Sequence, residues 1–284
     1  MRKMLSLLLV VLLSAALFAQ VTPIRDIQFT EDAGGDSPLV DQQVTVSGII
    51  TAEAYAFGSK YWVQDAEGAW NGIMVYDKNN KAAEGDSVTV TATVTEYYNL
   101  TELTDVTDFV LEKEGVFGIN PSVVTTVEIG TGGAMAEAYE GCLVSVENLT
   151  ITDPDLGHGE WLVDDGSGPC RVDDAADYFF DPAMYTEAGV VSVTGVLDYN
   201  YNDTKIQPRL AFDIVEGGMY TRLQRIQQVR YSDLMKSEVD ALADTSYLRG
   251  DTLTVKGVVT MPTGLSYAGA GIKFIFTEPE GGPW

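Results

Sequence analysis

The chain has 284 residues, of which 45% are hydrophobic and 21% are charged, a composition typical of a folded globular protein rather than a disordered one. Its 42 acidic residues outnumber its 17 lysines and arginines, so the formal net charge is −25. A field of this sign repels phosphates and anionic lipids, which excludes a basic nucleic-acid clamp as the default interpretation. One histidine and two cysteines also exclude a zinc finger, an iron–sulfur protein and a histidine-based hydrolase.

Residues 1–19 have the pattern of a secretory signal peptide. Two basic residues precede a short apolar run, and Ala19 precedes the change to polar sequence. This apolar run is too short to span a bilayer, which takes about 20 residues. We expect cleavage after Ala19; an uncleaved anchor is the minority alternative, because Leu17 is an imperfect residue for the cleavage signal. These features predict a bacterial protein that is secreted or lies at the cell surface, with no membrane partner.

The rest of the chain has the pattern of short β-strands. β-Branched and polar residues alternate, and Gly, Asn and Asp interrupt the runs, which is typical of strands joined by turns. Helical periodicity is confined to a short segment at 233–242. In the first unit five strands are predicted, at 43–52, 60–65, 72–76, 87–98 and 109–114.

Internal repetition organises these strands into units. The segment at 37–52 reappears at 246–261, with Gly48 opposite Gly257, and the segment at 60–70 reappears at 273–284 with one additional residue. A more distant middle unit has corresponding strands between residues 139 and 215. We therefore predict domains at 20–115, 116–216 and 217–284. The third lacks its later strands, so we expect an amino-terminal fragment of a longer protein whose other domains are its partners.

Five short strands per unit favour a closed Greek-key barrel of the OB type. Gly48, Gly195 and Gly257 interrupt otherwise β-branched strands, where a residue without a side chain permits the bend of a small barrel. The alternative is an immunoglobulin-like sandwich, which needs about seven strands. The predicted fold class is therefore all-β, with tandem five-stranded barrels, the third truncated.

The segments "IRDIQFTEDAGGDSPLVDQQVTVSGIITA", "YWVQDAEGAWNGIMVYD" and "EGDSVTVTATVTEYYNLTEL" resemble the OB-fold domains attached to secreted bacterial nucleases. The middle unit, with "YEGCLVSVENLTIT" and "WLVDDGSG", resembles a second OB-like type that accompanies them. In that family nuclease chemistry resides in a separate catalytic domain. The resemblance therefore implies a segment that is not itself an enzyme and that needs no cofactor.

An OB barrel usually binds ligands on its second and third strands and on the loops after the first and fourth strands. Aromatic side chains there can stack on bases or sugars, or fill a protein interface. Strand alternation sends Tyr61 and Val63 to one face and Trp62 and Gln64 to the other, so core packing is the competing interpretation for about half of these side chains. The ligand-binding candidates are Tyr55, Phe57, Lys60, Trp62, Trp70, Tyr97 and Tyr98.

The charge distribution weighs against phosphate contacts in the first two units. Residues 21–115 contain 5 basic and 17 acidic residues, and residues 116–216 contain 3 and 18. Lys60 is the only cation near the candidate face of the first unit. In the balanced third unit, Arg222, Arg225 and Arg230 can reach phosphates, but pairing with acidic neighbours is the favoured interpretation.

Three other features have structural interpretations. The acidic loops of the middle unit carry hard oxygen ligands but lack the spacing of an EF-hand, so no metal site is predicted. Cys142 and Cys170 lie on predicted strands, where a disulfide and two buried thiols remain alternatives. His158 lies in a glycine-flanked turn without a catalytic partner pattern.

These observations lead to one functional hypothesis with an alternative. The chain is expected to be a non-catalytic tandem OB-fold segment of a larger secreted protein that binds single-stranded nucleic acid or another ligand. The alternative is a structural or adhesive spacer that can bind a glycan and has no nucleic-acid affinity.

Overall fold

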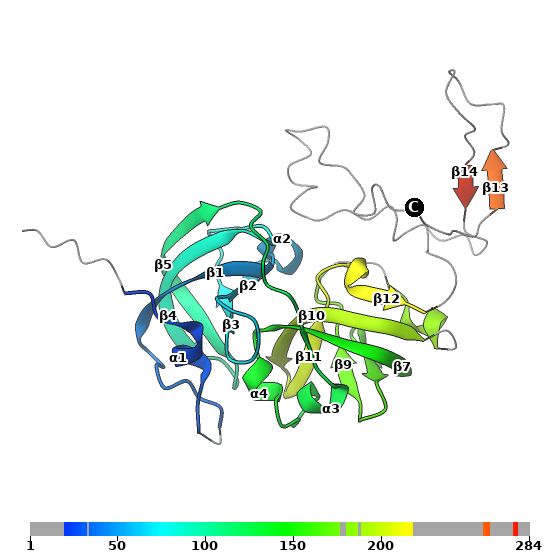
Figure 1. Cartoon of the computed structure of the whole chain (residues 1–284), viewed down its shortest axis with the longest axis horizontal. Coiled ribbons are helices and arrows are strands. Elements are labelled where there is room, and N and C mark those ends of the chain that lie inside the picture. Colours follow the sequence, from blue (N-terminus) through cyan, green and yellow to red (C-terminus); the bar gives the residue numbers. More distant parts are fainter. Residues whose placement is uncertain are drawn as a thin grey trace, which may run out of the picture.

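The computed structural model describes residues 20–32, 34–176, 180–186 and 189–217, together with the backbone of 258–261 and 275–277. The expected signal peptide, the helix at 233–242 and Arg222, Arg225 and Arg230 lie outside these residues. Two β-barrels lie side by side in the described part of the chain (Figure 1).

The first barrel contains five strands, and its closed order is β1-β2-β3-β5-β4. The pair β3–β5 is parallel, and the other neighbouring pairs are antiparallel. Short helices precede β1 and connect β1 to β2. The elements are α1 (Ile24–Gln28), β1 (Gln43–Ala52), α2 (Ala54–Phe57), β2 (Lys60–Gln64), β3 (Gly72–Tyr76), β4 (Ser87–Glu96) and β5 (Thr101–Lys113).

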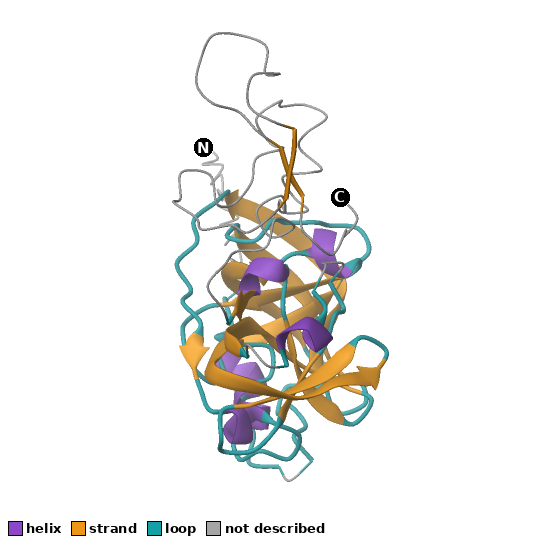
Figure 2. Cartoon of the chain, turned by 90° about the vertical axis from the view of Figure 1, so that its right-hand side faces the viewer, coloured by secondary structure: helices purple, strands orange, loops and turns teal. Residues whose placement is uncertain are grey.

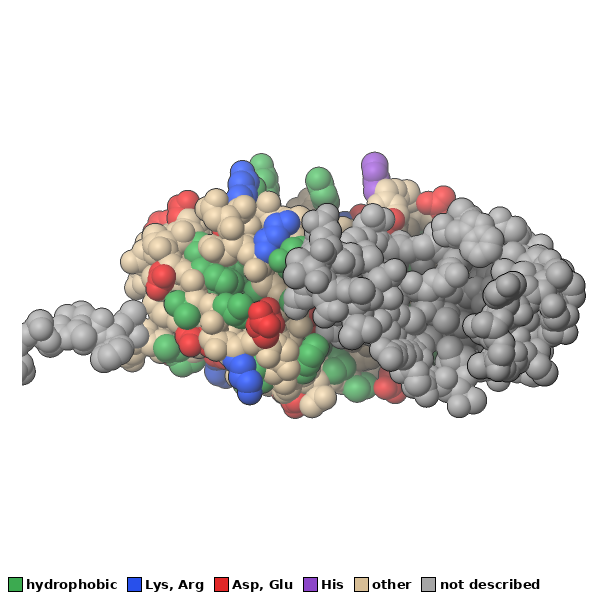
Figure 3. All heavy atoms as spheres, turned by 90° about the horizontal axis from the view of Figure 1, so that it is seen from above, with side chains coloured by type: hydrophobic (Ala, Val, Ile, Leu, Met, Phe, Trp, Pro, Cys, Tyr) green, Lys and Arg blue, Asp and Glu red, His purple; other side chains and the backbone are tan. Residues whose placement is uncertain are grey.

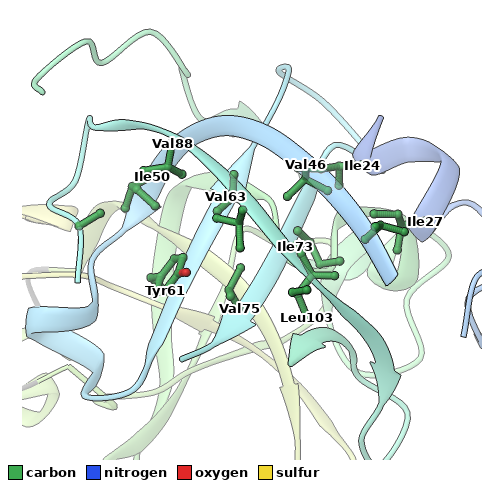
Figure 4. Packing of buried hydrophobic residues seen from close by; sticks show 14 of the residues in the cluster. Ile24, Ile27, Val46, Ile50, Tyr61, Val63, Ile73, Val75, Val88 and Leu103 are labelled. Atoms are coloured by element: carbon green, nitrogen blue, oxygen red, sulfur yellow. The ribbon is translucent and has the colours of Figure 1, made fainter. Parts of the chain in front are cut away.

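Alternation along the strands fills the first barrel. In β4 every second side chain from Val88 to Val94 is buried, and the residues between them are partly exposed. Tyr61 and Val63 of β2 point into the same core, as the period of two predicts. Ile24 and Ile27 of α1 join this core, and Figure 4 shows the converging side chains.

The second barrel repeats this topology. Its strands pair in the order β7-β8-β9-β11-β10, the pair β9–β11 is parallel, and β10 pairs with β7 to close the barrel. The elements are β6 (Ser122–Val123), α3 (Thr126–Ile129), α4 (Ala136–Tyr139), β7 (Leu143–Gly157), β8 (Glu160–Asp164), β9 (Cys170–Val172), η1 (Pro182–Tyr185), β10 (Val190–Asn200), β11 (Asp203–Gln207), η2 (Ala211–Asp213) and β12 (Ile214–Glu216).

The all-β fold class is therefore confirmed, and the sandwich alternative is wrong for both described units. Strands account for most of the ordered secondary structure in Figure 2. None of the helices in the described ranges is long and apolar enough to cross a membrane. Cys142 and Cys170 are buried free thiols, so the disulfide alternative is wrong.

Two glycines allow neighbouring strands to approach closely. A Cβ atom on Gly48 of β1 would lie 2.4 Å from the carbonyl oxygen of Gln64 on β2. A Cβ atom on Gly195 of β10 would lie at the same distance from the carbonyl oxygen of Gln207 on β11. Any side chain at these positions would therefore push a barrel strand away from its neighbour.

A separate antiparallel hairpin is formed by β13 (Val258–Met261) and β14 (Ile275–Thr277). When the repeats are aligned as above, its three pairs correspond one for one to pairs between β1 and β2, and the register shift falls at the same place. This agreement supports the alignment of the two segments. The pairs are Val258↔Thr277, Val259↔Phe276 and Met261↔Ile275, beside Ile49↔Gln64, Ile50↔Val63 and Ala52↔Trp62.

The two complete barrels share a tightly packed interface. Gly72 and Gly141 lie backbone against backbone, because a Cβ atom on Gly72 would be 2.2 Å from the Gly141 carbonyl oxygen. The amide of Trp70 donates to the carbonyl of Ala138 at 2.6 Å. An apolar cluster from both barrels fills the interface; its buried members are Ala52, Trp62, Met74, Leu100, Leu143 and Val196.

Arg209 adds a polar connection across this interface. Its guanidinium donates to the carbonyl oxygen of Thr51 and to Glu84 of the first barrel, both at 2.9 Å. It also forms a bidentate pair with Asp213 of its own barrel. Buried ion pairs with several hydrogen bonds fix relative orientation, so Arg209 helps to hold the barrels in one arrangement.

Candidate functional site

The expected ligand face of the first barrel is covered by the second barrel. Trp62 of β2 and Met74 of β3 are each only 1% exposed, because they pack against the second barrel in the shared cluster. Phe57 lies edge-on to Trp62, with 5.0 Å between ring centroids. The placement of Trp62 and Phe57 on an open binding face is therefore wrong in this structure. Strand alternation correctly separated Trp62 from Tyr61 and Val63, which fill the barrel core, but it did not predict this interface.

Three further candidates are partly buried around this contact. The Tyr55 ring lies 5.3 Å from the Lys81 ammonium. Trp70 packs edge-on to Phe29 at 5.3 Å. Lys60 lies at the start of β2, where its charge acts on a buried carboxyl discussed below. These side chains have structural partners, and they do not form one open surface.

Tyr97 and Tyr98 are the candidates that the structure leaves open to solvent. Their exposed fractions are 59% and 80%, and they lie in the connection between β4 and β5. The amides of Tyr97 and Leu100 each donate to the other residue's carbonyl, which leaves Tyr98 and Asn99 as a two-residue loop. Both have positive φ, at 52° and 67°. This is the pattern of a type I′ hairpin turn.

The second barrel presents the same turn in the corresponding connection. Asn200 pairs with Asp203, and Tyr201 and Asn202 between them have φ of 52° and 67°. Tyr201 is 91% exposed. Our sequence reasoning missed Tyr201, although the Tyr-Asn dipeptide at equivalent places in two repeated units was a signal that could have identified it.

A tyrosine at the first loop position is unusual for this turn. Type I′ turns favour Asn, Asp or Gly, and a bulky residue with positive φ carries backbone strain. Strained backbone is concentrated at functional sites. Both barrels have an exposed tyrosine at this strained turn position. This pair of turns is therefore the candidate functional site.

A pocket of about 360 Å³ lies between the two hairpins. Asn99 contributes from the first barrel, and Tyr199 and Thr204 contribute from the hairpin of the second. Glu137 of α4 and the adjacent Glu140 also line the pocket. The pocket therefore lies beside the first turn, through Asn99, and beside the strands that flank the second turn, through Tyr199 and Thr204.

Two carboxyl groups of the second barrel at the junction have raised pKa values, although Glu137 is exposed and only Glu140 is buried. Desolvation, followed by the charges of Glu96 and Asp36, raises the pKa of Glu137 to about 7. Burial, followed by the charge of Glu137, raises the pKa of Glu140 well above its usual value. Neither shift was predicted, because α4 is too short to produce a helical pattern in the sequence.

A third carboxyl at the junction belongs to the first barrel. Burial raises the pKa of Glu102 on β5 to about 7; the charge of Lys60 opposes this rise, and Asp198 of β10 increases it. Asp198 is 2% exposed, and its Oδ1 atom has no hydrogen-bond donor. The junction therefore favours neutral carboxyls or a cationic neighbour.

The acidic side chains in the loops of the second barrel accept hydrogen bonds that stabilise those loops. Asp164 accepts hydrogen bonds from the amides of Gly166 and Gly168 at 2.7 and 3.0 Å. Burial of Asp165 acts to raise its pKa, but the hydrogen bonds that it accepts from Ser167 and from Thr126 at the start of α3 outweigh this and lower the pKa to about 2. No group of three His, Cys, Asp or Glu side chains suited to a metal ion occurs in the part of the chain that the structure describes.

The basic side chains of the second barrel are engaged in ion pairs. Arg171 contacts Glu160 at 2.6 Å and Asp203 at 3.2 Å. Lys205 is 1% exposed and pairs with Glu160, with its ammonium 5.5 Å from the Tyr201 ring centroid. The described surface in Figure 3 shows acidic side chains and separate lysine or arginine side chains dispersed among hydrophobic and uncharged ones. Contacts in this region would therefore depend on stacking more than on phosphate charge.

Comparison with known proteins gives one distant relative. The chain is 23% identical over 261 residues to a protein named Endonuclease YhcR from Bacillus subtilis (strain 168). The match covers 85% of this chain but only 20% of that protein. No protein-family model matches the chain. No solved structure matches it at a significant level.

This similarity corrects one expectation. The sequence led us to expect no enzymatic activity in this chain, whereas the matching protein is named an endonuclease. The expectation of a non-enzymatic segment is therefore not upheld. The similarity does support the association with secreted nucleases that the sequence resemblance implied.

Proposed function

We propose that the two barrels form a nucleic-acid-binding unit of a nuclease-type protein and hold single-stranded nucleic acid on their paired β4–β5 and β10–β11 turns. The observation that carries this proposal is the exposed tyrosine at the same strained turn position in both barrels, Tyr98 and Tyr201. The distant similarity to an endonuclease supports the ligand class.

Stacking is the interaction that these turns can supply. Every base has a π-face, and a base stacked on an aromatic side chain contributes about 1 to 3 kcal/mol. Tyr97 and Tyr98 lie edge to face at 4.7 Å, which holds the two rings of the first turn in a fixed relation. With a net charge of −25, we expect binding with a shallow salt dependence, unlike that of a basic clamp.

The test measures binding of a fluorescent single-stranded oligonucleotide to the whole chain by anisotropy. We expect Tyr98→Ala and Tyr201→Ala each to weaken binding by about fivefold to a hundredfold. Tyr76→Ala is the matched control, because Tyr76 is also an exposed tyrosine, at 37%, but lies on β3 outside the turns.

Two further measurements complete the experiment. Incubating the same oligonucleotide with the chain and divalent cations shows by gel whether bound strands are cut. Equal binding by the wild-type chain and both tyrosine variants would remove these turns from the proposal. Retention of a glycan on an array without oligonucleotide binding would instead support the adhesive alternative, since tyrosines also stack on sugars.

A further inference from the structure

The two tyrosine turns differ in the charged side chain that follows each turn on its strand. Tyr98 of the first turn is followed by Glu102, and Tyr201 of the second turn is followed at the same interval by Lys205. The two positions are equivalent, because each lies in the parallel strand pair of its barrel and precedes a residue that is buried in the barrel core. The chain therefore has a carboxyl group at this position in the first barrel and an ammonium group in the second.

Lys205 is held against the Tyr201 ring by two carboxylates. The residue is 1% exposed, and its ammonium pairs with Glu160 of β8 and lies 3.6 Å from Asp173. The same ammonium lies over the Tyr201 ring, 5.5 Å from the ring centroid. A buried lysine is costly unless it is paired, so these contacts fix the position of its charge. One face of the Tyr201 ring therefore has a fixed cation beside it.

The other face of the Tyr201 ring is open to a ligand, because the residue is 91% exposed. A cation on one face of an aromatic ring draws π-electron density toward itself. The opposite face then becomes a better stacking partner for an electron-rich ring. Purines have a larger stacking area than pyrimidines, and guanine is the most electron-rich of the common bases, so guanine gains most from such a face.

The Tyr98 ring has a different neighbour. Tyr97 lies edge to face with it, with 4.7 Å between the ring centroids. In the part of the chain that the structure describes, no lysine or arginine lies over the Tyr98 ring. A base preference that originates in a cation behind the ring should therefore belong to the second turn alone.

We propose that Lys205 is a positioning residue for the Tyr201 turn and gives this turn a preference for purine bases, guanine above all. Lys205 does not touch the base and acts through the ring. The Tyr98 turn stacks on any base. This inference rests on the proposed function, since it names the class of base that one of the two turns selects within single-stranded nucleic acid.

The test compares the binding of two fluorescent single strands of about twelve nucleotides to the whole chain by anisotropy. One strand contains only thymine, and the other has guanine at alternate positions, which avoids the association of guanine runs. The measured quantity is the ratio of the two dissociation constants, because a change that merely weakens the fold alters both constants together. We expect the wild-type chain to favour the guanine strand by about twofold to fivefold.

Variants of the two turns locate the preference. Tyr201→Ala should bring the ratio close to one, whereas Tyr98→Ala should weaken the binding of both strands and keep the preference. Lys205→Met, which keeps the length of the side chain and removes its charge, should also bring the ratio close to one. Glu160 keeps Arg171 as its partner in this variant, at 2.6 Å, so its carboxylate is not left unpaired.

Lys81→Met is the matched control. The Lys81 ammonium lies 5.3 Å from the centroid of the Tyr55 ring, a cation–ring pair outside the turns, so the ratio should keep its wild-type value. A wild-type ratio near one, an unchanged preference in Lys205→Met or Tyr201→Ala, or an equal loss in Lys81→Met would overturn this inference and leave the proposed function in place. Binding of neither strand would overturn both. If circular dichroism shows that Lys205→Met does not fold, loss of the preference in Tyr98→Ala instead of Tyr201→Ala would still overturn the inference.

Discussion

Glu102 is a single residue whose titration should be visible in the stability of the whole fold. It is 7% exposed on β5, and burial raises its pKa to about 7. The folded state therefore holds this proton more tightly than the unfolded chain does. Between pH 4.5 and pH 7 the folded state binds more protons, so the free energy of unfolding falls as the pH rises through this range.

The variant Glu102→Gln tests this pH dependence. The wild-type chain should lose stability between pH 5 and pH 8, and Glu102 should account for about 1 to 3 kcal/mol of that loss. In Glu102→Gln, urea unfolding should show a smaller difference between the two pH values, whereas the exposed Glu147→Gln should behave like the wild type. An unchanged difference in Glu102→Gln would mean that this carboxyl titrates as it does in the unfolded chain.

At the scale of an element, we expect the residues of the hairpin turn between β4 and β5 to favour ligand binding and to lower the stability of the fold. Tyr98 and Asn99 occupy a type I′ loop for which Asn-Gly is the favoured pair. A double variant, Tyr98→Asn with Asn99→Gly, should therefore raise the free energy of unfolding by about 1 kcal/mol. The same variant should lose oligonucleotide binding, because it removes the most exposed ring of the turn.

Thermal unfolding and anisotropy on one preparation of this variant measure both effects. Tyr201→Asn with Asn202→Gly provides the matched experiment in the second barrel. A less stable hairpin after the exchange would show that the edge-to-face contact between Tyr97 and Tyr98 stabilises the turn more than positive φ strains it. In that event the tyrosines would have a structural reason to be there.

Strand positions were predictable because each strand shows its own alternation. The segments 43–52 and 72–76 coincide with β1 and β3. The predicted last strand at 109–114 began too late, since β5 starts at Thr101. Its first half is polar and threonine-rich and pairs with β4 directly after the Tyr98-Asn99 turn, so its strand character comes from that pairing and not from its own pattern.

The candidate site was less predictable, because much of it depends on contacts between units. Alternation placed Trp62 on the face opposite to Tyr61 and Val63, and only the second barrel explains why it is buried. Glu140 reaches the pocket from the end of a four-residue helix that no window of sequence reveals. Tyr98 was named from the sequence and Tyr201 of the matching hairpin was missed, but both lie within one hairpin; residues that meet only across the junction have no such local signal.

At the scale of the whole molecule, the junction between the barrels determines whether the two tyrosine turns act together. Two ligand-bearing turns held at a fixed spacing bind one strand more tightly than two turns on a flexible tether. Here the spacing depends on the backbone contact of Gly72 with Gly141. It also depends on the reach of Arg209 to Thr51 and Glu84.

Gly72→Ala should separate the barrels without unfolding them. The added Cβ atom would meet the Gly141 carbonyl oxygen at 2.2 Å, and Gly72 has no positive φ that would strain an alanine by itself. We expect a larger radius of gyration in small-angle scattering, and oligonucleotide affinity should fall toward that of a single turn. Arg209→Ala should act in the same direction, whereas Arg171→Ala, which breaks ion pairs only within the second barrel, should leave both quantities unchanged. Scattering and affinity that match the wild type in both Gly72→Ala and Arg209→Ala would mean that the apolar cluster around Trp62 is sufficient to hold the two turns in register.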